Sequence, residues 1–94
     1  MYTIDFDPAV KKIIAKWKKS NPIRFKKLKK VLLDIQEHPR SGIGHPEPLI
    51  GGSNITYSRH ISGNDRIIYD VYDLEIHVLV VELEGHYNDK SSRR

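Results

Sequence analysis

Cysteine is absent from this 94-residue chain, and long apolar runs are absent too. Without cysteine there can be no disulfide, no thiol nucleophile and no cysteine metal site. No apolar run approaches the roughly 20 residues that cross a bilayer, and residues 1–6 are too short and too polar for a secretory signal. We therefore expect a single domain over residues 1–94 that works in the cytoplasm without a membrane.

Motifs for metals and cofactors are also missing. The five histidines form neither an i, i+4 pair on a helix nor a compact cluster with carboxylates, so no metal site is expected. The sequence contains no Gly-rich phosphate loop and no G-x-S-x-G elbow. We expect no cofactor, and acyl hydrolase chemistry finds no support.

Positive charge is abundant and unevenly distributed. Lys and Arg number 16 against 12 Asp and Glu, and the isoelectric point is about 9.4. Ten of the sixteen cations lie between residues 11 and 30: Lys11, Lys12, Lys16, Lys18, Lys19, Arg24, Lys26, Lys27, Lys29 and Lys30. Such a surface suits RNA or an acidic protein partner, but it is equally typical of a solvated helix. Lys26 and Lys30 are the candidate RNA-binding residues of this group.

Two helices are predicted from capping signals and apolar spacing. Asp7-Pro8 and Asn21-Pro22 each place a capping residue before a proline at the first helical position. Apolar residues then recur at helical spacing, as Val10, Ile13, Ile14 and Trp17 in the first segment and Phe25, Leu28, Leu32 and Ile35 in the second. The pattern predicts helices from about Pro8 to Lys19 and from Pro22 to near His38, joined by a short turn.

Strands are predicted on both sides of this helix pair. Residues 2–6 alternate as in a half-buried strand, whereas residues 39–53 hold three prolines and read as a loop. Alternation then predicts a hairpin of strands 55–61 and 66–72, and the apolar run in Ile76–Leu83 is typical of a strand buried on both faces in the middle of a sheet. The predicted fold is α+β: a strand, a two-helix hairpin and an antiparallel three-strand meander, with the helices packed on one face of the sheet.

The apolar residues of the hairpin also predict its turn. Ile61 and Ile67 should share a face, which requires an odd number of loop residues, so we expect residues 63–65 as a three-residue loop. The polar face then collects Ser58, His60, Arg66 and Asp70. Arg59 falls on the apolar face and would have to extend to the surface or pair near a strand edge.

Four residues in the second half have the side chains needed to cut RNA without a metal. Cleavage by the neighbouring 2′-hydroxyl needs a base, a cation for the phosphate and an acid for the leaving 5′-oxygen. Glu47 lies between two prolines that could hold it rigidly as the base, and Arg66 could grip a phosphate oxygen. His86 could be the acid, because histidine titrates near neutral pH, and Tyr87 could stack on a base. Each residue alone also fits an ordinary surface or structural role.

Together, these motifs resemble the YoeB toxins of the RelE/ParE superfamily, which belong to bacterial type II toxin-antitoxin pairs. The resemblance is carried by Gly44-His45-Pro46-Glu47-Pro48-Leu49, Tyr57-Ser58-Arg59-His60-Ile61, Arg66-Ile67-Ile68-Tyr69 and Gly85-His86-Tyr87. It covers nearly the whole chain and is specific in the second half.

The resemblance implies the RelE-like microbial RNase fold and a ribosome-dependent mRNA endonuclease that cuts in the ribosomal A site and inhibits translation. It implies that Glu47 is the general base, Arg66 binds the phosphate, His86 is the general acid and Tyr87 positions the substrate. Arg59 and His60 are expected to contact the RNA. The implied partners are a YefM-like antitoxin, the 70S ribosome with its mRNA, and operator DNA only as part of the toxin-antitoxin complex.

Three departures from the family pattern stand out. Ile50 stands where the family commonly has a lysine, and His60 stands where it has the second arginine of Ser-Arg-Arg. We therefore expect weaker or more pH-dependent activity, since a histidine is charged only at lower pH. The residues beyond Tyr87, Asn88–Arg94, form a polar tail that we expect to be loose.

Other functions on the same fold are compatible with the sequence. One is a RelE-superfamily nuclease with another ribosomal cutting preference, and another is a non-enzymatic toxin that inhibits gyrase by protein contact, like the ParE toxins. A third is a degenerate toxin that retains antitoxin binding without catalysis. The Pro-Glu-Pro-Leu loop and the terminal His-Tyr pair favour the nuclease, because a gyrase inhibitor has no need of an acid and a base.

Overall fold

A computed structural model of the chain describes residues 1–49 and 55–84. Its elements are β1 (Thr3–Phe6), α1 (Pro8–Ser20), α2 (Pro22–Glu37), β2 (Glu47–Pro48), β3 (Thr56–Ser62), β4 (Asp65–Tyr72) and β5 (His77–Glu84). The strands in this part of the chain form a five-stranded sheet in the order β1-β5-β4-β3-β2. β1 runs parallel to β5, and the other neighbours are antiparallel.

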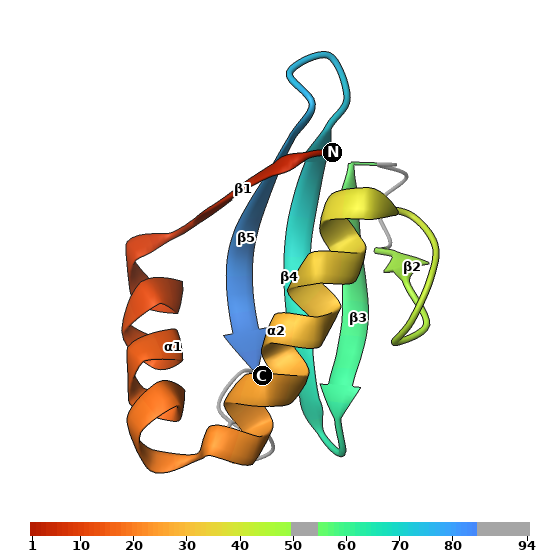
Figure 1. Ribbon diagram of the computed structural model, residues 1–94. Helices are drawn as coiled ribbons and strands as arrows, with labels where there is room; N and C mark the ends of the chain where they lie inside the picture. The colour runs from red at the N-terminus through yellow and green to blue at the C-terminus, as the bar shows by residue number, and fades with distance from the viewer. Residues whose placement is uncertain (50–54, 85–94) are drawn as a thin grey trace.

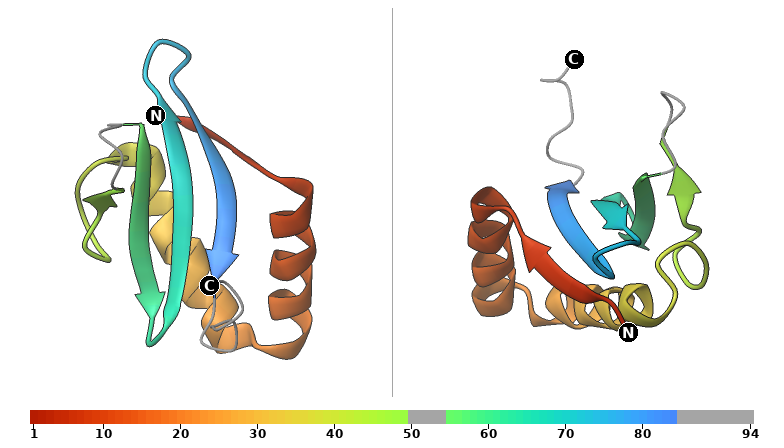
Figure 2. Two further views of the ribbon diagram at one scale, coloured as in Figure 1. Left: turned by 180° about the vertical axis from the view of Figure 1, so that it is seen from behind. Right: turned by 90° about the horizontal axis from the view of Figure 1, so that it is seen from above.

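The two helices lie on one face of the sheet (Figures 1 and 2). α2 crosses the inner face of β3 and β4, and α1 lies beside β5. The predicted α+β fold, with its helix pair and three-strand meander, is confirmed. None of the helices in the described residues is long and apolar enough to cross a membrane.

Both helices begin where the sequence signals place them. Pro8 and Pro22 occupy the first turns, and the Asn21 side chain accepts a hydrogen bond of 3.2 Å from the backbone N–H of Arg24. The Asn21 backbone N–H also donates to the carbonyl of Trp17 at 2.8 Å. One residue therefore ends α1 and caps α2, satisfying backbone groups that would otherwise lack partners.

The core lies between the helices and the inner face of the sheet. Its buried residues are Val10, Trp17, Leu28, Val31 and Ile35 from the helices and Tyr57, Ile67, Tyr69, Val71, Val78, Val80 and Leu83 from the strands. β5 lies inside the sheet, between β1 and β4, as expected. The prediction that β5 is buried on both faces is wrong: Leu79 and Val81 are only half-buried, because α1 and α2 both pack against the other face.

The β3–β4 hairpin differs from the predicted one. His60 pairs with Arg66 and Ser62 pairs with Asp65, so that Ile61 is left between them as a β-bulge. Without this bulge a two-residue turn would set Ile61 opposite Arg66. With the bulge, His60 and not Ile61 lies opposite Arg66.

The turn itself consists of Gly63 and Asn64. Gly63 has a φ of +50°, which suits the first central residue of a type II′ turn. The predicted three-residue loop is wrong because the bulge, and not the loop, supplies the odd residue.

Candidate active site

The sheet has an open face, on the side opposite α1 and α2, and three of the predicted site residues share it. Glu47 pairs with Ser58, which lies two residues before His60 on β3, and His60 pairs with Arg66 on β4. Alternate residues of a strand point to the same side, while the intervening Arg59 is buried. Glu47, His60 and Arg66 are all exposed. Figure 2, left panel, looks onto this face.

The spacing of the strands sets the distance between the carboxylate and the arginine. Glu47 and Arg66 lie two strands apart and are offset by two residues along the strands. Ordinary sheet dimensions separate their backbones by about 12 Å. Side chains that rise from the open face at these two positions can both contact a ribose phosphate bound above the sheet.

The segment that carries Glu47 is tied to β3 on both sides. The backbone N–H of Leu49 donates to the carbonyl of Thr56 at 2.9 Å, and that of His60 donates to the carbonyl of Gly44 at 2.8 Å. Gly44 has a φ of +80°, and a Cβ there would lie 2.5 Å from the His60 carbonyl oxygen. Only glycine fits this close approach. The sequence predicted a loop here, and the short strand β2 was missed.

Arg59 is buried, and its guanidinium organises the start of this segment. The Arg59 side chain has no exposed area. Its Nε donates to the Tyr69 hydroxyl at 2.9 Å and its Nη1 donates to Asp34 at 2.6 Å. The remaining contacts are backbone carbonyls: Nη1 donates to Ile43, and Nη2 donates to Ser41 and His38.

This arrangement corrects the expected role of Arg59. Its place on the apolar face, beside Tyr57, is as the alternation predicted. Its guanidinium, however, is turned inward and hydrogen-bonded at all three nitrogens, so it is not available to RNA. Arg59 is instead a positioning residue for the loop that leads to Glu47.

The partners of Arg59 have perturbed acidities. Burial raises the pKa of Asp34, but hydrogen bonds from Arg59 and from the Ile43 backbone outweigh it, and the net pKa is lowered. Burial raises the pKa of Tyr69, with the Arg59 hydrogen bond acting in the opposite direction. The Tyr69 hydroxyl donates in turn to the carbonyl of Pro39 at 2.7 Å. Asp34 is thus held as a carboxylate and Tyr69 as a neutral phenol.

A second ion pair holds the same loop from outside. Arg40 donates two hydrogen bonds to Asp73, at 3.0 and 2.6 Å, and the Tyr2 hydroxyl donates to Asp73 at 2.7 Å. These hydrogen bonds, that of Arg40 first, lower the pKa of Asp73. The loop is therefore linked to the β4–β5 turn and to the first residues of the chain.

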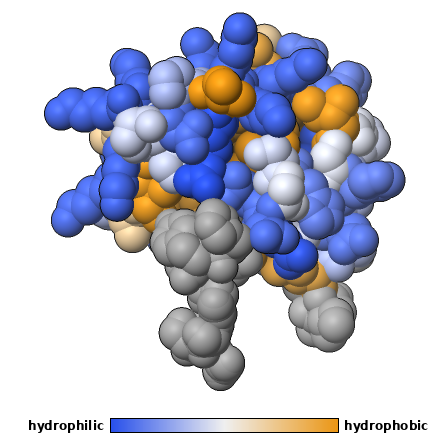
Figure 3. All heavy atoms as spheres, turned by 90° about the horizontal axis from the view of Figure 1, so that it is seen from below, coloured by the Kyte–Doolittle hydropathy of each residue, from blue (hydrophilic) through white to orange (hydrophobic). Residues whose placement is uncertain are grey.

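The remaining predicted residues lie elsewhere. Lys26 and Lys30 belong to α2, so they are on the helical side of the sheet and not on the open face. Figure 3 views the molecule from the end where α1 leads into α2, and hydrophilic side chains cover most of this surface. His86, Tyr87, Ile50 and the tail 88–94 lie outside the described residues. β5 is described up to Glu84, which is in register with Arg66.

Sequence reasoning missed Asp34 and Tyr69 as supports of the site. The available signal was Arg59 itself, because an arginine on an apolar face needs buried acceptors. The identity of these acceptors could not be predicted from the sequence. In the described residues no three His, Asp or Glu side chains gather in a way that could hold a metal ion.

Fold and site together define a small basic α+β domain whose open sheet face carries a carboxylate, a histidine and an arginine. The family model for a YoeB-like toxin of a bacterial type II toxin-antitoxin system matches residues 6–87. Toxin YoeB of Mycobacterium bovis is 32% identical over 79 residues, which cover 84% of this chain and 93% of the relative. The chain belongs to the YoeB-like toxin family.

Solved structures agree with this assignment. The YoeB-YefM complex from Staphylococcus aureus matches with a TM-score of 0.78 and 28% identity, over 93% of this chain and 99% of the other. The isolated E. coli RelE toxin matches with a TM-score of 0.67 and 26% identity, over 97% of this chain and 88% of the other. The RelE-like fold expected from the sequence is therefore confirmed.

Proposed function

We propose that this toxin is a ribosome-dependent endoribonuclease that cleaves mRNA in the A site without a metal. The observation that supports the proposal is the sheet register, in which Glu47, His60 and Arg66 lie on the same exposed face, with His60 next to Arg66. A base and a phosphate-binding cation on one accessible surface are what 2′-hydroxyl attack requires.

In the proposed reaction the RNA supplies its own nucleophile. Glu47 accepts the proton of the 2′-hydroxyl as its oxygen attacks the neighbouring phosphorus, and Arg66 stabilises the negative charge that builds on the phosphate oxygens. The bond from phosphorus to the 5′-oxygen breaks, and His86 gives that oxygen a proton. The products are a 2′,3′-cyclic phosphate and a 5′-hydroxyl, with Tyr87 positioning the substrate. DNA lacks the 2′-hydroxyl and cannot react in this way.

The surrounding residues have supporting roles in this proposal. His60, which lies opposite Arg66 in the sheet, contacts the same phosphate. Arg59 holds the loop that presents Glu47. Lys26 and Lys30, on the helical side, contact phosphates of ribosomal RNA or of mRNA away from the reacting bond.

We also propose that a YefM-like antitoxin holds the toxin inactive. The support is the YoeB-YefM complex from Staphylococcus aureus, to which this chain is similar over most of its length. The basic helices suit an acidic partner as well as the ribosome. Operator DNA would be bound only by the toxin-antitoxin complex.

Primer extension on a defined mRNA, with and without programmed 70S ribosomes, tests the nuclease. We expect cleavage only with ribosomes, and a rate lowered about 10²- to 10⁴-fold by Glu47→Gln. Glu75→Gln is the matched control, because Glu75 is exposed in the turn between β4 and β5. Equal rates for the two variants would remove Glu47 as the base. No cleavage by the unaltered chain would favour a protein-binding toxin, and gyrase inhibition would then be measured.

A further inference from the structure

Two largely buried ion pairs tie the β3–β4 hairpin to α2, one from each strand. On β3, Arg59 donates to Asp34 at 2.6 Å. On β4, the carboxylate of Asp65 accepts a hydrogen bond of 2.8 Å from Nε of Arg24. The Arg24 side chain is 18% exposed and the Asp65 side chain 7%. Helix and hairpin thus each supply one cation and one anion, so that the observed pairing joins opposite charges at both places.

Arg24 is the main partner of the Asp65 carboxylate in the described part of the chain. The Cζ atom of Arg24 lies 4.5 Å from the centroid of the buried Trp17 ring, which holds the guanidinium in place. The Ser62 hydroxyl is 3.5 Å from Asp65, at the limit of a hydrogen bond. The other carboxylate oxygen, Oδ1, is buried and has no hydrogen-bond partner among residues 1–49 and 55–84. Without Arg24 the carboxylate would be buried without a cation.

The local sequence of the turn suits a different arrangement of the hairpin. Residues 63–65 could form a three-residue loop, in which Asp65 would be in contact with water. In the structure Asp65 is instead buried as the first residue of β4. Both arrangements keep Ile61 and Ile67 on the helical side, so the burial of these two residues does not choose between them. The bond to Arg24 favours the observed arrangement, because it holds Asp65 at the start of the strand.

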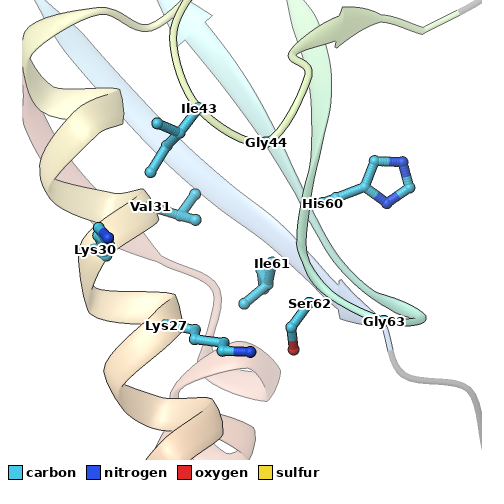
Figure 4. Close-up of a pocket in the computed structure, with 9 residues that line it drawn as sticks. All are labelled: Lys27, Lys30, Val31, Ile43, Gly44, His60, Ile61, Ser62 and Gly63. Atoms are coloured by element: carbon cyan, nitrogen blue, oxygen red, sulfur yellow. The ribbon is translucent and has the colours of Figure 1, made fainter.

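Apolar packing around the bulge is open. A hollow of about 400 Å³ lies between α2, the end of β3 and the segment before β2. Figure 4 shows Val31 and Ile61 directed into it, Ser62 and Gly63 near the turn, and the imidazole of His60 on the other side of the strand. Ile61 is only half-buried. Close packing therefore does not fix the register at this end of the hairpin, and an ion pair that holds one position has more influence here than in a dense core.

The register sets the distance between the carboxylate and the arginine of the candidate active site. In the structure Glu47, which pairs with Ser58, is level with Ile68 on β4. A three-residue loop would shift every pair of the hairpin by two residues, and Glu47 would then be level with Asp70. Its offset from Arg66 along the strands would grow from two residues to four, which is about 7 Å more.

We propose that the ion pair of Arg24 and Asp65 sets the register of the β3–β4 hairpin. It ties β4 to α2, just as the pair of Arg59 and Asp34 ties β3 to the same helix. A slip of two residues between these strands would separate one of the pairs by about 7 Å. Fixing a register is the best attested use of buried polar groups. Arg24 and Asp65 are thus positioning residues; their effect on catalysis rests on the proposed function, whereas their effect on the register does not.

Disulfide formation between introduced cysteines measures the register, because the chain has no cysteine of its own. Ser58→Cys is combined with Ile68→Cys to report the observed register, with Asp70→Cys to report the shifted one, or with Tyr72→Cys to report unfolding alone. Directly paired residues have Cα atoms about 4.5–5.5 Å apart, which suits a disulfide, whereas diagonal neighbours are about 7–8 Å apart. Mass spectrometry follows the rate of each disulfide in oxidised glutathione.

The unaltered background should form the 58–68 disulfide fast and the other two slowly. Arg24→Met should raise the rate of the 58–70 disulfide, relative to that of the 58–72 disulfide, at least about tenfold. A loss of stability alone would raise both rates together, since loops of similar length close with similar probability. Arg24→Lys keeps a cation and should restore most of the ratio. The matched control is Lys29→Met, which removes another α2 cation that lies over an aromatic ring and should change the ratio by less than about twofold.

The proposal is overturned if Arg24→Met leaves this ratio within about twofold of the unaltered chain, or if Lys29→Met raises it as much. The trapped disulfide forms then connect the register to catalysis. The 58–70 form should cleave ribosomal mRNA at least about 10²-fold more slowly than the 58–68 form, because its carboxylate and arginine are misplaced. Equal cleavage by the two forms would contradict the roles of Glu47 and Arg66 and leave the register result standing, so the two proposals can fail separately.

Discussion

Replacing Arg59 by methionine would remove the guanidinium while keeping a long side chain in the same buried space. The change deletes hydrogen bonds to Asp34, to Tyr69 and to three carbonyls of the loop 38–43. Asp34 would then be a partly buried carboxylate without its cation, since its side chain is only 21% exposed. We therefore expect a large loss of stability.

The expected size of the loss follows from the burial of the pair. Removing one partner of a buried ion pair typically costs about 3–5 kcal/mol. Because the Asp34 side chain keeps some access to water, we expect a loss about 1 kcal/mol smaller than this, about 2–4 kcal/mol. A chain of this length has a total stability of roughly 5–14 kcal/mol, so the variant would lose a substantial part of it.

Urea unfolding followed by Trp17 fluorescence would measure the effect, because this single tryptophan is buried in the core. Arg40→Met is the matched control, because Arg40 also pairs with an aspartate, Asp73, through two hydrogen bonds, but both of these side chains are well exposed. Its midpoint should shift far less. A loss below about 1 kcal/mol for Arg59→Met, or equal shifts for the two variants, would refute the reasoning.

Three further predictions concern the loop before β2, the loss of stability at low pH and the open face of the sheet. Gly44→Ala should destabilise the chain by about 1–3 kcal/mol in urea, and more than Gly63→Ala, where a Cβ would meet nothing within 4 Å; equal losses would contradict this. The folded-state pKa of Asp73 is lowered. The stability that its carboxylate adds is therefore present at pH values above the ordinary pKa of aspartate, and it is lost as the pH falls through the folded-state pKa. Asp73→Asn should therefore flatten the fall of the urea midpoint between about pH 5 and pH 2, and an unchanged fall would contradict this. His60→Arg places a guanidinium at this exposed position opposite Arg66 and should raise the rate of ribosomal mRNA cleavage, whereas an unchanged rate would disprove the role of His60.

The helices could be predicted from the sequence because their signals are local. Asp7-Pro8 and Asn21-Pro22 each combine a capping residue with a proline, and the helices begin at these positions. The apolar spacing that follows needs only a few consecutive residues to be recognised. Local signals of this kind also located β1, β3, β4 and β5.

The hairpin register depends on an irregularity that alternation does not encode. Two arrangements place Ile61 and Ile67 on one side, a three-residue loop or a two-residue turn with a bulge. The structure has the second, with Gly63 at the position of positive φ. The face of the sheet on which each polar residue lies was nevertheless predicted correctly, because both arrangements put the same residues on that face.

The candidate site could be predicted in part. The strand that presents Glu47 has only two residues, too few to show a period, and its pairing with Ser58 follows from contacts formed in the folded chain. The Arg59 network joins α2, the loop 38–43 and β4, which are far apart in the sequence. His86 and Tyr87 lie outside the described residues, so their roles stay predictions.

The parallel pairing of β1 with β5 has a consequence for synthesis of the toxin. Thr3 is in register with His77, so the first strand can complete its side of the sheet only after the last strand has been made. Pairing between such distant segments closes a large loop and comes late in folding. A growing chain thus has the residues of both helices before it has those of a complete sheet. The sheet that carries Glu47 and Arg66 is therefore complete only once residues 77–84 have been translated.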